Sequence, residues 1–179
     1  MHGIRRDVLH AQAKALGLPL LEAFIDAPAD NASYERAHEE ALQRASQRWP
    51  GLQHCAYGDL FLKDVRHYRE QQLAQSRWQG VFPLWGEDTA ALSRRFLADG
   101  HSAKVVCVDS SQLSVDFCGR DYDADLLDDL PNSVDPCGEH GEFHTLSYAG
   151  PMFSAPLCLH RGVSVLRDDR FQYTDFLLD

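Results

Sequence analysis

One run of eleven residues, 135–145, is the most informative part of this sequence. The run combines three carboxylates, two imidazoles, a thiol and two glycines, which are Asp135, Cys137, Gly138, Glu139, His140, Gly141, Glu142 and His144. Carboxylates this close together repel one another, and glycine lets the backbone approach a ligand or adopt a positive φ. The run therefore predicts either a solvated acidic turn that leads into a strand at Phe143, or a binding or catalytic site.

Two other kinds of chemistry are compatible with the same residues. The spacing Cys137-x-x-His140-x3-His144 could hold zinc together with one carboxylate, but its outer ligands would straddle the junction between loop and strand, and the neighbouring glutamates would crowd the metal. A Cys-His nucleophile pair would need a third group to orient the imidazole, and the sequence does not identify one. We assign no metal ligand, and both alternatives stay open.

Composition limits the partners that this chain can bind. The 179 residues are 44% hydrophobic, which suffices for one sizeable core or two small ones, and the net charge of −10 argues against a broad contact with a nucleic-acid backbone. Five cysteines without a CxxC pair argue against a disulfide framework. The longest apolar runs are far shorter than a membrane span, and we recognise no secretory leader. We expect a soluble, cytoplasmic protein that binds a small molecule or a basic partner and neither nucleic acid nor membrane.

Strand and helix patterns alternate through about residue 109. Apolar spacing and capping signals predict helices at 4–16, 33–45, 64–78 and 88–98, with Ser33 as an N-cap after a loop through Pro28, and strands at 18–21, 53–60, 81–85 and 103–109. This order is typical of βαβ units in a largely parallel sheet. We therefore predict an α/β domain over residues 1–109.

The pattern changes after residue 110. Two short helical pieces precede the acidic run, and strand patterns follow it: the helices are expected at 111–118 and 123–130, and the strands at 143–148, 157–159, 163–167 and 171–177. We predict a second, smaller α+β domain over residues 110–179, packed closely against the first because no flexible linker separates them.

Two predicted strand ends carry a further candidate site. Ligands of parallel α/β sheets bind beyond the carboxyl ends of the strands, where Gly58-Asp59 and Trp85-Gly86 fall. The alternative interpretation is that the glycines allow turns and that Asp59 caps a helix.

Motifs ordered along the whole chain resemble the diphthine–ammonia ligase family and its relatives among the PP-loop ATP pyrophosphatases. Each motif alone is weak, but their order is specific, above all the pattern Cys-Gly-Glu-x-Gly-Glu-Phe-x-Thr near the end. They are Met1-His2-Gly3-Ile4, Gln12-Ala13, Leu16-Gly17-Leu18-Pro19-Leu20, Tyr57-Gly58-Asp59-Leu60 with Asp64 and Arg66, Pro83-Leu84-Trp85, Ala103–Val108, Gly119-Arg120, Cys137–Thr145 and Gly150-Pro151-Met152-Phe153.

The resemblance implies a PP-loop (HUP-type) parallel sheet followed by the smaller domain, and it favours an enzyme. The implied reaction uses ATP and Mg²⁺: a carboxylate is adenylated, pyrophosphate leaves, and ammonia captures the acyl group as an amide. The residues that would serve are Glu139, Glu142 and His144 in catalysis, Asp135, Cys137, Gly138, Gly141, Phe143 and Thr145 in substrate binding, and Gly3, Gly58 and Asp59 in nucleotide binding. Diphthine carries a trimethylammonium group, for which acidic residues walled by Phe143 would form a sensible receptor.

Two departures from the family pattern shape the remaining expectations. The SGGKDS-type turn that wraps the ATP phosphates in PP-loop enzymes does not occur in this sequence, which suggests an N-terminally incomplete sheet, weak ATP binding and exposed strand edges that a second copy could cover. Such a chain could also be a non-catalytic ligand-binding module. His144 stands where diphthamide-forming ligases usually carry an acid, so the chain resembles bacterial-type relatives, whose acyl substrate would be something other than diphthine.

Overall fold

The computed structural model describes residues 3–25, 30–74 and 76–179, which form two compact units. One unit comprises Leu20–Gly86, and the other combines the chain up to Pro19 with Glu87–Asp179. Met1 and His2 of the resemblance, Pro28 of the predicted loop and Gln75 of the predicted helix 64–78 fall outside the described residues.

The unit 20–86 contains a single βαβ crossover after one long helix. Its elements are α2 (Asn31–Arg48), β1 (His54–Ala56), α3 (Lys63–Leu73) and β2 (Gln79–Val81). β1 and β2 pair in parallel, as the alternating pattern predicts. The N-cap of α2 is Asp30, whose side chain accepts a hydrogen bond from Ser33 N, so the predicted cap at Ser33 is wrong by three residues.

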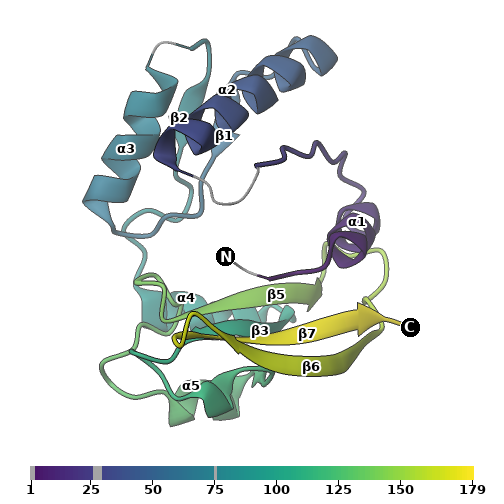
Figure 1. The fold of residues 1–179 in the computed structure, drawn as a ribbon, viewed down its shortest axis with the longest axis vertical. Helices are drawn as coiled ribbons and strands as arrows, with labels where there is room; N and C mark the ends of the chain where they lie inside the picture. The colour runs from purple at the N-terminus through teal and green to yellow at the C-terminus, as the bar shows by residue number, and fades with distance from the viewer. Residues whose placement is uncertain (1–2, 26–29, 75) are drawn as a thin grey trace. The chain divides into compact units, whose positions relative to one another are not determined.

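Most of the described chain belongs to the other unit. Its elements are α1 (Arg6–Ala15), α4 (Thr89–Ala98), β3 (Ser102–Asp109), the 3₁₀ helix η1 (Val115–Phe117), β4 (Asp121–Tyr122), α5 (Ala124–Asp129), β5 (Phe143–Ala149), β6 (Leu159–Arg167) and β7 (Phe171–Leu178). Figure 1 shows β6 and β7 as long neighbouring arrows, with β5 and β3 in the same sheet. α1 contacts β7.

β3 is the centre of this second sheet, and its pairing is antiparallel throughout. It pairs with β5 along most of its length, with β4 near its start and with β7 near its end. β6 continues the sheet beyond β7. The expectation that 103–109 joins a PP-loop parallel sheet is therefore wrong. The molecule is a mixed α/β protein with a small parallel sheet and a larger antiparallel one.

Side chains of β3 enter two cores, and an irregularity of the strand between Val105 and Cys107 lets residues three positions apart share one of them. Val105 and Val108 join a cluster with Phe143, Leu126 of α5 and the partly buried Phe96 of α4. Val106 joins a cluster with Val8 of α1, Leu146 and Phe176. The sheet therefore has α4 and α5 associated with one core and α1 with the other, and the acidic run enters β5 beside the first of them.

The division of the chain differs from the expected boundary near residue 110. α4 and β3 belong with the C-terminal residues, because β3 supplies the central partner of β5 and β7. No helix among the described residues is long and apolar enough to cross a bilayer.

Candidate functional site

The acidic run forms a compact loop between α5 and β5, and Glu142 holds it together. The Glu142 side chain is fully buried, with 2% of its surface exposed. Its Oε1 accepts a hydrogen bond of 2.9 Å from Asp135 N, and its Oε2 accepts one of 3.0 Å from His140 N. One carboxylate thus connects the start of the loop at Asp135 to its later part at His140. Hydrogen bonds from backbone N–H groups of this kind are strong when the acceptor is a carboxylate. Glu142 is not the exposed, repelling carboxylate that its spacing suggests.

Asp135 and two glycines complete the backbone geometry of the loop. Asp135 Oδ1 accepts hydrogen bonds from Cys137 N at 2.8 Å and Glu139 N at 3.4 Å, and Gly138 N donates to Asp135 O. Gly138 has φ +68°, and a Cβ there would stand 2.6 Å from Phe143 O. Any other residue at 138 would meet both a strained backbone and a clash. The glycine therefore serves the fold of the loop, whatever else it does.

The aromatic residue of the motif faces inward. Phe143 is 3% exposed and lies in the core cluster with Tyr122, so its ring is not available as the wall of a substrate pocket in this structure. Tyr122 also donates a hydrogen bond of 2.6 Å from its hydroxyl to Pro136 O. Sequence reasoning missed Tyr122 as a support of the loop, and no local pattern could reveal it, because the contact spans fourteen positions.

The thiol of the motif is held in its neutral form. Burial first, and then the charges of Asp135, Glu139 and Asp88, raise the pKa of Cys137 to about 12. Cys137 Sγ lies 3.4 Å from Thr89 O, at the start of α4. A nucleophilic cysteine needs a lowered pKa, so these surroundings oppose the Cys-His nucleophile pair.

Cys137 is accordingly expected to alkylate slowly in the folded protein. At pH 8, iodoacetamide should modify the exposed Cys158 about a hundredfold faster than Cys137, because so little of the Cys137 thiol is ionised. Mass spectrometry of peptides from timed samples measures both rates, and unfolding in guanidinium is the control that should equalise them. Equal rates in the folded protein would contradict the raised pKa.

The remaining members of the motif lie around the loop and the start of β5. Glu139, His144 and Thr145 are partly exposed, and His144 and Thr145 pair along β5 with Cys107 and Val105 of β3. The structure thus places all the predicted residues between Asp135 and Thr145 in one loop and strand end. Within that set, Glu142 and Phe143 are buried.

The predicted nucleotide-binding residues do not gather in one unit. Gly58 and Asp59 follow β1 in the unit 20–86, where Asp59 Oδ2 lies 3.8 Å from Arg69 Nε. Gly3 belongs to the other unit and has φ +67°, and a Cβ there would stand 2.6 Å from the ring of Tyr173. The glycine at position 3 therefore lets the backbone lie close to the ring of Tyr173.

Among the described residues, no three histidine, cysteine, aspartate or glutamate side chains form a cluster that could hold a metal ion. The zinc interpretation of Cys137, His140 and His144 therefore gains no geometric support from the part of the chain that the structure describes.

Comparison with known proteins identifies the segment that contains this loop. Residues 88–167 match the family model of the diphthamide synthase C-terminal domain. The match begins at Asp88, the N-cap of α4, and ends at the last residue of β6, so it spans β3, the acidic loop and β5. A search of curated proteins found no match. The family match agrees with the motifs found along residues 103–145: this part of the chain is similar to the diphthamide synthase C-terminal domain.

Proposed function

We propose that this chain serves ATP-dependent amide formation of the diphthine–ammonia ligase type, and that the acidic loop binds its acyl substrate. The observation that carries the proposal is the family match, which covers the whole loop. The geometry of the loop supports it. Hydrogen bonds from two backbone N–H groups fix the buried Glu142, and Glu139 and His144 remain partly exposed beside it. A preorganised loop of this kind orients a ligand at low entropic cost.

The residues of the motif have three different roles in this proposal: positioning, contact with the substrate, and support of the loop. Glu142 is a positioning residue, because its carboxylate is occupied by Asp135 N and His140 N. Glu139, His144 and Thr145 are the side chains that would meet the substrate. Asp135, Cys137, Gly138 and Gly141 shape the backbone around it, and Phe143 anchors the loop in the core.

ATP and Mg²⁺ are the co-reactants that the family reaction requires. The described residues proposed for the nucleotide do not by themselves fit its phosphates. Asp59 is an anion paired with Arg69, Gly3 is packed against Tyr173, and neither provides a cradle of backbone N–H groups. We therefore assign no step to bound ATP. This observation favours the second candidate function, a binding module that recognises a ligand without activating it.

The acyl substrate in this proposal is a carboxylate other than diphthine. Histidine at position 144 gives the loop less fixed negative charge than the acid usual in diphthamide-forming ligases, so a trimethylammonium group should bind less well. His144→Glu is accordingly expected to tighten the binding of trimethylammonium ligands.

A pyrophosphate-release screen tests the proposal and separates the two functions. Because ATP binding is expected to be weak, the 179-residue chain is incubated with a large excess of MgATP, with ammonium and a panel of carboxylates, and in parallel with elongation factor two bearing diphthine. A ligase should release pyrophosphate with a carboxylate of the panel. Glu139→Gln should lower that release at least about tenfold, whereas the exposed Asp128→Asn should leave it unchanged.

Three outcomes decide between the candidates. Release with diphthine alone would confirm the ligase and refute the proposed substrate. Absence of release together with a trimethylammonium affinity that Glu139→Gln weakens would identify a binding module. Neither release nor binding at the loop would refute both.

A further inference from the structure

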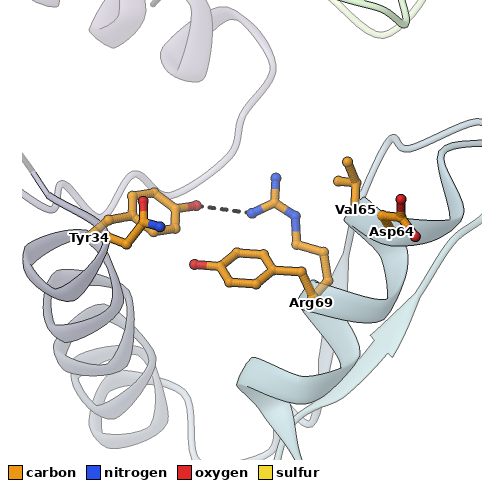
Figure 2. A pocket seen from close by; sticks show the side chains of 6 residues that line it. Tyr34, Asp64, Val65 and Arg69 are labelled. Carbon is orange, nitrogen blue, oxygen red and sulfur yellow. Dashed lines mark hydrogen bonds between the residues drawn. The ribbon is translucent and has the colours of Figure 1, made fainter.

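A second candidate site belongs to the unit 20–86, whereas the acidic loop belongs to the other unit. A pocket of about 530 Å³ opens between α2 and α3. This volume is within the range of small-molecule sites. Figure 2 shows Tyr34 and Arg69 facing each other across the pocket, with Asp64 and Val65 on the side of α3. The described lining residues are Asn31, Tyr34, Asp64, Val65, Tyr68 and Arg69.

Arg69 is the one cation among these lining residues, and its charge is incompletely neutralised. Arg69 Nη1 donates a hydrogen bond of 3.0 Å to the Tyr34 hydroxyl. Asp59 Oδ2 lies 3.8 Å from Arg69 Nε, which is within ion-pair distance but too far for a hydrogen bond. The guanidinium also lies 5.0 Å from the centre of the Tyr57 ring. A neutral hydroxyl, an aromatic ring and one distant carboxylate thus surround the charge, and none of them forms a bidentate pair with it.

Arg69 and its ion-pair partner Asp59 each keep a buried polar atom that makes no hydrogen bond. Four buried side-chain atoms of the described residues make no hydrogen bond: Arg69 Nε and Asp59 Oδ2, which face each other as a long ion pair of 3.8 Å, the Tyr57 hydroxyl and Gln72 Oε1. Leaving such a group buried and unpaired costs about 1–3 kcal/mol, so native proteins rarely keep several together. Of these four residues only Arg69 lines the pocket, and its Nε, which makes no hydrogen bond, could still donate one to a ligand.

Two other polar residues of the pocket lining, Asp64 and Tyr68, already have favourable interactions within the protein. They therefore limit the kinds of ligand that the pocket can bind. Asp64 stands in the first turn of α3, where a negative charge complements the helix dipole. The Tyr68 hydroxyl donates to Glu35 and accepts from Gln72 Nε2. The free donor capacity is therefore concentrated on Arg69, whose planar N–H groups match the oxygens of a carboxylate or phosphate.

We propose that this pocket binds a small molecule that presents an oxyanion to Arg69 and lays a flat apolar body against Tyr34 and Tyr68. The oxyanion is a carboxylate or a phosphate. Tyr34 positions the guanidinium through its hydroxyl, and Asp64 and Asn31 face polar substituents of the ligand. This site is independent of the acidic loop and of the proposed amide-forming reaction.

A titration followed by nuclear magnetic resonance tests the site with three probes. Benzoate and benzylamine share a ring but carry opposite charges, and inorganic phosphate presents an oxyanion without a ring. We expect benzoate or phosphate to cause saturable shifts of the backbone amides of residues 31–34 and 64–69, and benzylamine to cause none there. Tighter binding of benzoate would identify a carboxylate site, and tighter binding of phosphate a phosphate site.

Three variants locate the charge that is responsible. Arg69→Gln should weaken the binding of the oxyanion at least about tenfold, because it removes the charged donor. Tyr34→Phe keeps the ring and should weaken binding several-fold, so it decides the matter if Arg69→Gln fails to fold by circular dichroism. Arg44→Gln, an exposed cation elsewhere on α2, should change nothing. The proposal is overturned if no oxyanion binds saturably, if benzylamine binds in its place, or if Tyr34→Phe and any folded Arg69→Gln protein bind like the wild type.

Discussion

Replacing Glu142 by alanine is expected to lower the free energy of unfolding by about 3 kcal/mol. The variant leaves the N–H groups of Asp135 and His140 without their buried acceptor. It also creates a cavity, because the Glu142 side chain that it removes is only 2% exposed. Glu142→Gln should cost less, because one amide oxygen can still accept a hydrogen bond while the amide nitrogen faces the other N–H. Urea unfolding followed by circular dichroism measures both differences.

Hydrogen exchange tests whether the stability lost in Glu142→Ala is lost in the acidic loop. The amides of Asp135 and His140 should lose protection in Glu142→Ala while the amides of α3, in the other unit, keep theirs. Asp128→Asn, an exposed acid in the same unit, is the matched control and should change the stability by less than about 0.5 kcal/mol. Unchanged stability of Glu142→Ala would show that the buried carboxylate is not what orders the loop.

Local signals in the sequence predicted most helices and several strand positions. The positive φ of Gly17 and Gly100, +65° and +81°, follows the ends of α1 and α4 as the capping signals require. β3 lies within one residue of its predicted range. Hydrophobic periodicity and glycine placement are properties of short segments, so one sequence suffices to read them.

Pairing between distant segments could not be predicted in the same way. The alternation of strand and helix suggested that 103–109 joins a parallel sheet, but its partners β4, β5 and β7 all follow it and run antiparallel. The apolar run 18–21 forms no strand, and Leu18 is 61% exposed. The predicted strands 157–159 and 163–167 form one strand, β6, with an irregularity between Arg161 and Ser164. β6 returns into β7 through Asp168 and Asp169, both at positive φ.

The candidate site shows the same division between local and distant information. Spacing alone located the acidic loop, and the segment that contains it is similar to the diphthamide synthase C-terminal domain. Spacing could not separate Glu142 from Glu139, because burial depends on which carboxylate turns toward backbone N–H groups. It also could not reveal the contacts from Tyr122 and Thr89, which arrive from other elements.

Asp109, at the end of β3, is expected to make the fold sensitive to acid. Its carboxylate is 2% exposed and accepts hydrogen bonds from Arg170 Nε and Nη2 at 2.9 and 2.5 Å, from Ser111 Oγ at 2.7 Å and from Gln112 Nε2 at 3.0 Å. Arg170 is the main cause that lowers the pKa of Asp109, and Ser111 and Gln112 lower it further against the opposing effect of burial. Asp109→Asn should therefore lower the free energy of unfolding by about 2 kcal/mol at pH 7. This is less than the roughly 3–5 kcal/mol lost when a fully buried ion pair is broken, because Arg170 is half exposed and regains water.

The sign of the pH dependence follows from the lowered pKa. An unfolded aspartate titrates near pH 3.9, so Asp109 contributes its full stabilisation above about pH 4 and loses it as the pH falls toward the lower folded pKa. The urea concentrations at which wild type and Asp109→Asn are half unfolded should thus become equal as the pH falls below about 4. Arg170→Gln keeps the buried carboxylate but removes its main partner, so it should raise the pKa of Asp109 and move the acid transition to higher pH. Asp128→Asn should follow the wild-type curve throughout, and a constant difference between wild type and Asp109→Asn down to pH 2 would show that ionisation of Asp109 does not stabilise the fold.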